Sequence, residues 1–163
     1  GTVSTLAGAE TLENKTLTSP IASNTAGSTV LTLTSVAGGT DPESKWVQDR
    51  TGTSDATPTV IATITIPATT TLGIKAYVSA RRTSGAAGTD EDGAFYEVSV
   101  VYKNVAGTAT IIGSSTITAI GESQAAWNVT LNPTSNTVQI LGTGAANNNV
   151  SWICTAQLFP CST

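Results

Sequence analysis

Short runs in which apolar residues alternate with Thr, Ser or other polar residues dominate this sequence. The clearest run, LGIKAYVSARR, carries one apolar set on a single strand face: Leu72, Ile74, Ala76, Val78 and Ala80. Similar runs follow one another, each roughly 5 to 10 residues long and bounded by Gly, Asn, Asp or Pro. No window keeps a helical period for more than two turns. We therefore predict an all-β chain of about nine or ten strands.

This spacing of short strands predicts an antiparallel two-sheet sandwich, jelly-roll-like in form. The chain of 163 residues is long enough for one such core. Two features argue against a parallel nucleotide-binding sheet: the strands alternate instead of being apolar throughout, and no Gly-rich phosphate-binding motif occurs. We expect one β-sandwich knob over residues 28–163.

Residues 1–27 differ from the rest because they lack a clear periodicity. Leu6, Leu12 and Leu17 recur five to six positions apart, which matches neither a helix stripe nor a strand alternation. Together with Ile21 they form an apolar set that the segment cannot bury alone, so we expect contacts with other copies or another chain. We predict an extended N-terminal stem. The opening Gly-Thr-Val lacks a Met, so we expect a processed product or a piece of something longer.

The low charge of the chain excludes several classes of partner. Only 11% of the residues are charged and the formal net charge is −4, whereas an average soluble domain is roughly 25% charged. Lys and Arg gather nowhere beyond the pair Arg81-Arg82, so we expect no nucleic-acid partner. Apolar runs such as residues 60–66 fall far short of the roughly 20 residues that span a bilayer, so we expect no membrane partner.

The residue types that carry most enzyme chemistry are scarce. The chain has no His to activate a nucleophile and only two Cys, which also excludes a zinc site of the usual kind. Most carboxylates fall in segments that we predict to be turns. Glu97 falls in a predicted strand, and the alternation of that strand turns it outward. Asp90, Glu91 and Asp92 could hold a hard cation, but we favour a polar hairpin loop. We expect no catalytic residue, cofactor or metal, and no enzymatic activity.

The two cysteines, Cys154 and Cys161, lie seven positions apart and either close a small loop or stay free. Cys154 lies within an alternating apolar run, which favours a buried free thiol.

The natural candidates for stacking against sugar rings are the aromatic side chains of Trp46, Trp127, Trp152, Tyr77, Tyr96 and Tyr102. Trp127 and Trp152 are in phase with apolar neighbours, so we expect both in the core. Trp46 and Tyr96 are the freer aromatic residues, and we propose them as candidate surface-binding residues.

Two stretches bear a family resemblance. TLENKTLTSPI resembles a phrase, NKTLTSP, that recurs in fibre, tail and neck proteins of tailed bacteriophages. From TVIATITIP to VSWICTAQL the chain is similar to a C-terminal β domain of phage fibre-like virion proteins. There an ARRT strand, an acidic loop, an aromatic strand, N-x-x-G-T-A, AAW-x-V and V-x-W recur in this order. The residues that carry the resemblance include Arg81, Arg82, Asn104, Gly107, Trp127 and Trp152.

This resemblance implies a structural virion protein of a tailed bacteriophage: a tail fibre, a head fibre or a capsid-decoration knob that serves host attachment. It implies a homotrimer with the stem wound about the threefold axis, and partners among other virion proteins and host-surface glycans. The alternative is a carbohydrate-binding module of a larger extracellular protein. We do not favour a glycan-cleaving tailspike fragment, because such enzymes usually need a longer solenoid with a cleft.

Overall fold

The computed structural model describes residues 29–34 and 42–162, and this part of the chain folds into strands without a helix. Ten strands succeed one another along these residues, with the following bounds: β1 (Thr29–Thr34), β2 (Pro42–Thr53), β3 (Thr59–Thr65), β4 (Thr70–Gly85), β5 (Gly93–Val105), β6 (Thr108–Ile111), β7 (Thr116–Glu122), β8 (Asn128–Thr134), β9 (Thr137–Thr143) and β10 (Asn148–Ser162). The described residues therefore contain no helix that could cross a membrane.

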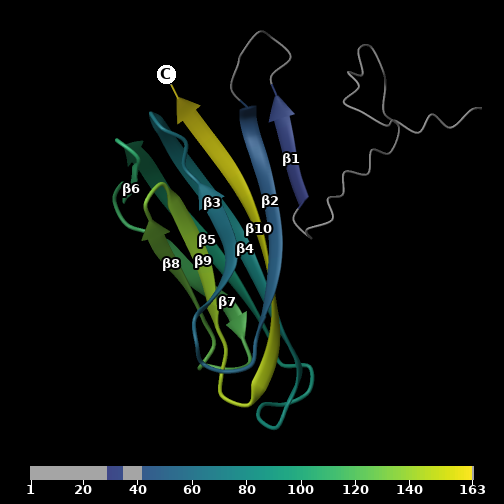
Figure 1. The fold of residues 1–163 in the computed structure, drawn as a ribbon. Coiled ribbons are helices and arrows are strands. Elements are labelled where there is room, and N and C mark those ends of the chain that lie inside the picture. The colour runs from purple at the N-terminus through teal and green to yellow at the C-terminus, as the bar shows by residue number, and fades with distance from the viewer. Residues whose placement is uncertain (1–28, 35–41, 163) are drawn as a thin grey trace, which may run out of the picture.

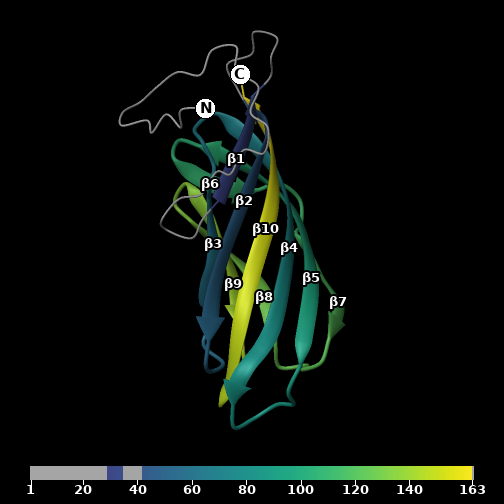
Figure 2. The same ribbon diagram turned by 90° about the vertical axis from the view of Figure 1, so that its right-hand side faces the viewer.

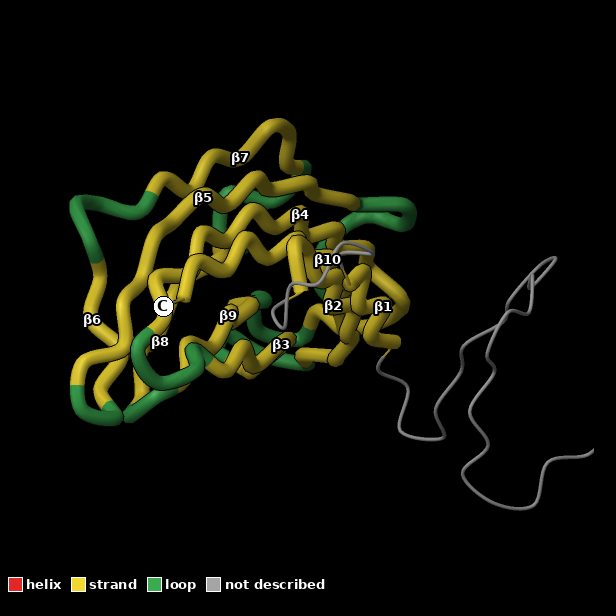
Figure 3. The backbone as a smooth tube through the Cα atoms, turned by 90° about the horizontal axis from the view of Figure 1, so that it is seen from above, coloured by secondary structure: helices red, strands yellow, loops and turns green. Residues whose placement is uncertain are grey.

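The strands form two antiparallel sheets of unequal size. The larger sheet has the order β1-β2-β10-β4-β5-β6, with β7 pairing to the other half of β5, and the smaller sheet has the order β3-β9-β8. Seen from above, the two sheets lie as two layers (Figure 3). These observations confirm the prediction of an all-β, two-sheet antiparallel sandwich, whereas a jelly-roll connection pattern stays a prediction.

Strand β10 lies in the middle of the larger sheet, with β2 on one side and β4 on the other (Figures 1 and 2). It pairs with β2 from Val150 to Leu158 and continues along β4 to Ser162. Pro160, which has no N–H to give to a ladder, lies beyond the end of the β2 pairing. The last strand thus pairs with β2, which lies about a hundred positions earlier in the sequence, and with β4.

Buried apolar side chains of β3, β4, β5, β8, β9 and β10 fill the space between the sheets. Trp152, with no exposed surface, lies at its centre and contacts two other aromatic rings. Its ring centroid is 6.3 Å from that of Tyr96 and 6.0 Å from that of Trp127. Its indole Nε1 donates a 3.0 Å hydrogen bond to Thr53 Oγ1. The prediction that Trp127 and Trp152 lie in the core is confirmed.

Two further residues hold the layers at close range. Gly142 of β9 faces inward, and a Cβ there would lie 2.7 Å from the ring of Trp152, so only glycine allows this approach. Asn104 of β5 is 6% exposed, and its Nδ2 donates a 2.6 Å hydrogen bond to the carbonyl of Ile66 after β3. Its Oδ1 accepts the N–H of Gly107 at 2.9 Å. One buried amide therefore links the larger sheet to the smaller one.

Candidate functional site

The larger sheet turns one face toward the core. Its other face, called the outer face below, points away from the core. On β4 and β5 the strand period turns Tyr77 and Phe95 outward, whereas their chain neighbours Val78 and Tyr96 point into the core. On β10 the same period turns Ile153 and Phe159 outward, each 42% exposed. Such large apolar side chains on a solvent-facing sheet contribute little to folding, so this face is a candidate binding surface.

Tyr77 and Phe95 form the most ordered feature of this face. Their ring centroids are 5.8 Å apart and their planes are within 11° of parallel. Tyr77 is paired with Glu97, so the two rings are diagonal neighbours across β4 and β5. The rings are 40% and 39% exposed. Exposed aromatic pairs of this kind offer apolar surface together with a phenolic hydroxyl.

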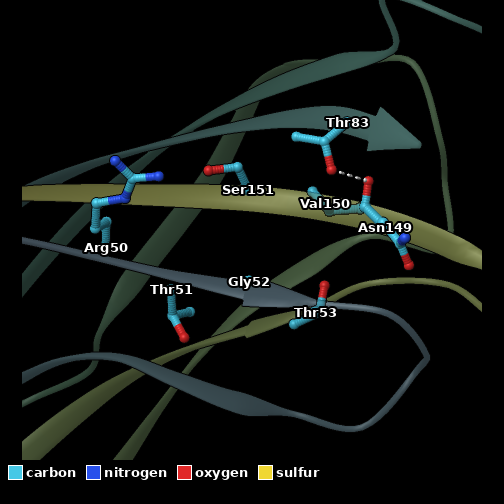
Figure 4. Close-up of a pocket in the computed structure, with 8 residues that line it drawn as sticks. All are labelled: Arg50, Thr51, Gly52, Thr53, Thr83, Asn149, Val150 and Ser151. Carbon is cyan, nitrogen blue, oxygen red and sulfur yellow. Dashed lines mark hydrogen bonds between the residues drawn. The ribbon is translucent and has the colours of Figure 1, made fainter. Parts of the chain in front are cut away.

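A hollow of about 420 Å³ opens where β2, β10 and β4 run side by side. Eight residues line it: Arg50, Thr51, Gly52, Thr53, Thr83, Asn149, Val150 and Ser151 (Figure 4). In the close-up the guanidinium of Arg50 and the hydroxyl of Ser151 lie on the same side of the sheet, opposite to the side chain of Thr51. A second hollow of about 200 Å³ shares Arg50 and is completed by Gln48, Asp49 and Ile153.

The acidic loop between β4 and β5 is a hairpin loop, as predicted, and side chains of β4 and of the segment after β7 engage its carboxylates. Arg82 donates to Asp90 and to the carbonyls of Ala87 and Gly85, and Arg81 is 2.5 Å from Glu91. Asp92 accepts bonds from the Thr89 N–H and the Gln124 amide. Among the described residues no group of three His, Cys, Asp or Glu side chains lies close enough to share a metal ion.

Burial raises the pKa of three groups in the interior: the phenols of Tyr96 and Tyr102 and the thiol of Cys154. Burial raises the pKa of the Tyr96 phenol, and its hydrogen bond to Glu122, which accepts at 2.9 Å, raises it further. Burial, assisted by the charge of Asp49, raises the pKa of the Cys154 thiol to about 12. Cys154 is a buried free thiol and Cys161 is exposed and also free, which confirms the expectation for Cys154. A neutral thiol is a poor nucleophile, so Cys154 acts as a core residue.

The two aromatic residues predicted for surface binding differ in their positions. Tyr96 is only 2% exposed, so the prediction that it offers a ring at the surface is wrong. Its position in β5 is in phase with Val98 and Val100, and Phe95 takes the outward place instead. Trp46 of β2 is half-buried and its role stays a prediction.

The predicted stem residues Leu6, Leu12, Leu17 and Ile21 lie outside the described residues, so their contacts and the boundary at residues 27 and 28 stay predictions.

Sequence reasoning missed Phe95 and Arg50 as members of this face, and it counted Tyr77 among the aromatic candidates without choosing it as a surface residue. A signal for Tyr77 was available, because it lies between Ala76 and Val78 in the clearest alternating run and must face the opposite way. No sequence signal places Arg50 beside Ser151, because their proximity depends on the pairing of β2 with β10.

Comparison with known proteins gives a small set of structural neighbours. No family model matches the chain, and no curated protein matches it. A tailspike protein, gp49 of Acinetobacter baumannii bacteriophage Fri1, described as a capsular polysaccharide depolymerase, aligns with 80% of this chain at 11% identity and a TM-score of 0.42. The tailspike of Acinetobacter baumannii phage AM24 aligns with 72% at 10% identity and a TM-score of 0.44. That of Acinetobacter phage vB_ApiP_P1 aligns with 71% at 18% identity and a TM-score of 0.32.

The chain spans only 19%, 26% and 21% of these three tailspikes. The expectation that a chain of this kind has no enzymatic activity is contradicted by the first of them, because gp49 is described as a depolymerase. The activity is stated of the whole gp49 protein, of which this chain matches a small part.

Proposed function

We propose that this chain is a fibre-like domain of a tailed-phage virion and contacts the host surface. In this proposal residues 28–163 form a knob, residues 1–27 form a stem, and three copies assemble about the stem. The support comes from the ordered phrases of the sequence and from the structural roles that their residues have.

The roles of the phrase residues are the observation that carries the proposal. Arg82, from ARRT, has a side chain that is 9% exposed and anchors the acidic hairpin loop. Asn104 and Gly107, from N-x-x-G-T-A, form the turn between β5 and β6, where Ala106 and Gly107 both have positive φ values. Trp127 and Trp152, from the last two phrases, contact each other in the core. Residues with such roles are those that a shared fold would keep.

Light scattering on the full chain tests the assembly. We expect a particle of three times the 16.4 kDa chain mass. Replacing Leu6, Leu12, Leu17 and Ile21 together by Asn is expected to give a folded monomer, because the apolar contacts that hold the stem would be lost. A wild-type chain that stays monomeric at micromolar concentration would contradict the trimer.

Binding of the fluorescently labelled chain to intact bacteria tests host contact. We expect binding to some strains of a panel of capsulated and uncapsulated cells, and loss of binding after the surface polysaccharide is removed. Labelling of no strain, or equal labelling of stripped cells, would contradict a role at the host surface.

A carbohydrate-binding module of a larger extracellular protein is the second candidate, favoured by the exposed stack of Tyr77 and Phe95. It predicts a monomer that binds neutral sugars through this stack. Loss of neutral-sugar binding in Tyr77→Ala, from a chain that is monomeric, would support this candidate over the virion domain.

A further inference from the structure

We propose that the hollow around Arg50 binds a saccharide that carries a carboxylate, such as a uronic acid. This inference rests on the proposed contact with the host surface and adds to it a place on the molecule and a chemical class of ligand.

The charge of the hollow comes from Arg50. Three described arginines lie near this end of the sheet, and two of them are engaged: Arg81 with Glu91, and Arg82 with Asp90. Arg50 has an exposed side chain and no ion pair among the residues whose side chains the structure describes. A guanidinium is charged at every physiological pH and matches a carboxylate with two parallel hydrogen bonds. The hollow thus presents an unpaired cation in a chain of net negative charge.

Ser151, Thr83 and Asn149 add polar groups to the lining of the hollow that Arg50 shares. Ser151 has no hydrogen-bond partner for its hydroxyl among the described residues, and it lies diagonally across from Arg50. The Thr83 hydroxyl donates to the Asn149 carbonyl at 3.2 Å, and the Asn149 amide donates to Ser84 at 2.8 Å, so the rim is held in place by its own bonds. Gly52 has no side chain and leaves the floor open. Groups that both donate and accept suit the hydroxyls of a sugar.

The shape of the site favours more than a single ion. The second hollow continues from Arg50 toward Gln48 and Ile153, so the two together form a groove along β2 and β10. Ile153 offers apolar surface for the C–H face of a sugar ring. Asp49 also lines this second hollow, and its Oδ1 accepts a 2.8 Å hydrogen bond from the backbone N–H of Arg50. Its negative charge places the ligand's carboxylate on the Ser151 side of Arg50.

An acidic peptide is the competing ligand. Within the described residues β1 pairs with β2 only up to Gln48, so the backbone of residues 49–53 has a neighbour on one side only. A peptide strand could add there. We favour the saccharide because side-chain hydroxyls and Arg50 line the face of the sheet, whereas a peptide would use the backbone at its edge.

The test measures binding of two tetrasaccharides to the full chain by calorimetry. The acidic probe is a hyaluronan tetrasaccharide, with alternating glucuronate and N-acetylglucosamine, and the neutral probe is chitotetraose. We expect binding of the acidic probe, at least about tenfold weaker binding to Arg50→Gln because a charge-assisted bond is lost, and weakening by salt. Ser151→Ala is expected to weaken binding by a smaller factor.

Two variants of equal charge change serve as controls. Arg81→Gln removes a guanidinium that Glu91 already engages, and Lys103→Gln removes a charge at the other end of β5. Both are expected to keep nearly wild-type affinity. Equal weakening by Arg50→Gln and Lys103→Gln, equal binding of chitotetraose, or tighter binding of a tetraglutamate peptide would each overturn the proposal. Binding of the chain to bacteria without any difference between wild type and Arg50→Gln would overturn this site and leave the host-surface function intact.

Discussion

Phe95 and Tyr96 are neighbours in the chain, yet they belong to two regions with different physical demands. Tyr96 contacts Trp152 in the core and its hydroxyl is bonded to Glu122, whereas Phe95 stacks on Tyr77 at the outer face with 39% of its surface exposed. On the inner face of the larger sheet the Tyr96 hydroxyl and the Trp152 indole N–H have hydrogen-bond partners, whereas the buried Oδ1 of Asn148 has none among the described residues. The outer face carries exposed apolar rings and Arg50, whose guanidinium has no ion pair among the described side chains, which is why we assign binding to it.

The largest test of this division replaces one aromatic residue on each face. Trp152→Ala is expected to lower the free energy of unfolding by about 3 to 5 kcal/mol. The variant leaves a cavity in the core, and Thr53 Oγ1 loses the hydrogen bond that the indole donates to it. Phe95→Ala is expected to cost about 1 kcal/mol, since only a partly exposed ring contact is lost. Urea unfolding followed by circular dichroism gives both values. Similar losses of unfolding free energy for the two variants would contradict the difference between the inner and the outer face.

Two glycines, one that faces the core and one on the outer face, provide the second test. Gly142 faces inward, and the Cβ of Gly142→Ala would meet the Trp152 ring and Ile61, so we expect a loss of about 1 to 3 kcal/mol. Gly121 of β7 is paired with Phe95, and a Cβ there meets nothing within 4 Å. Gly121→Ala is expected to be neutral or to stabilise by a few tenths of a kcal/mol. Thermal unfolding of both variants checks this, and a destabilised Gly121→Ala would count against an open outer face.

Two consecutive residues of β5 provide the next test. Asn104→Ala removes the buried amide that bonds Ile66 and Gly107, so we expect a loss of about 1 to 2 kcal/mol. Lys103→Ala changes a side chain on the opposite face and is expected to stay within about 0.5 kcal/mol of wild type. Urea midpoints of the two variants measure the difference. An unchanged midpoint for Asn104→Ala would mean that the amide does not join the sheets.

The last test compares the two cysteines in alkaline solution. The folded chain raises the pKa of Cys154 from an ordinary 9.0 to about 12, so above about pH 9 the unfolded chain loses a proton that the folded chain keeps. Stability is therefore unaffected below this pH and falls as the pH rises toward 12. Melting temperatures between pH 8 and pH 11 measure the slope. We expect a flatter slope for Cys154→Ala and a wild-type slope for the exposed Cys161→Ala, and equal slopes in all three proteins would contradict the assignment.

The sequence predicted the inner face better than the outer one, for a physical reason. Burial forces apolar residues into a period of two, so the inward set of β4 and the buried positions of Trp127 and Trp152 could be identified from local pattern alone. Tyr96 was wrongly predicted to be at the surface because Phe95 and Tyr96 are both aromatic. Only the period of two that Tyr96 shares with Val98 shows which of the two side chains faces the core.

Features that depend on long-range pairing could not be predicted. The sequence of β2 indicates only a short strand at Trp46 and Val47, because Asp49 and Gly52 are typical turn residues. The structure extends β2 to Thr53 because β10 pairs with it along this length. The hollow at Arg50 exists only once this pairing is made, so no local pattern announces it.

An NMR titration of the isotope-labelled full chain with the hyaluronan tetrasaccharide tests directly whether the outer face of the larger sheet binds the saccharide. If the outer face is the binding surface, the amide chemical shifts will change at residues 48–53 and 149–153 and in the neighbouring part of β4. The amide chemical shifts of β3, β8 and β9 will not change. Shifts centred on the smaller sheet, or a titration that leaves the β2 and β10 amides unchanged, would contradict the central claim that the outer face of the larger sheet is the binding surface.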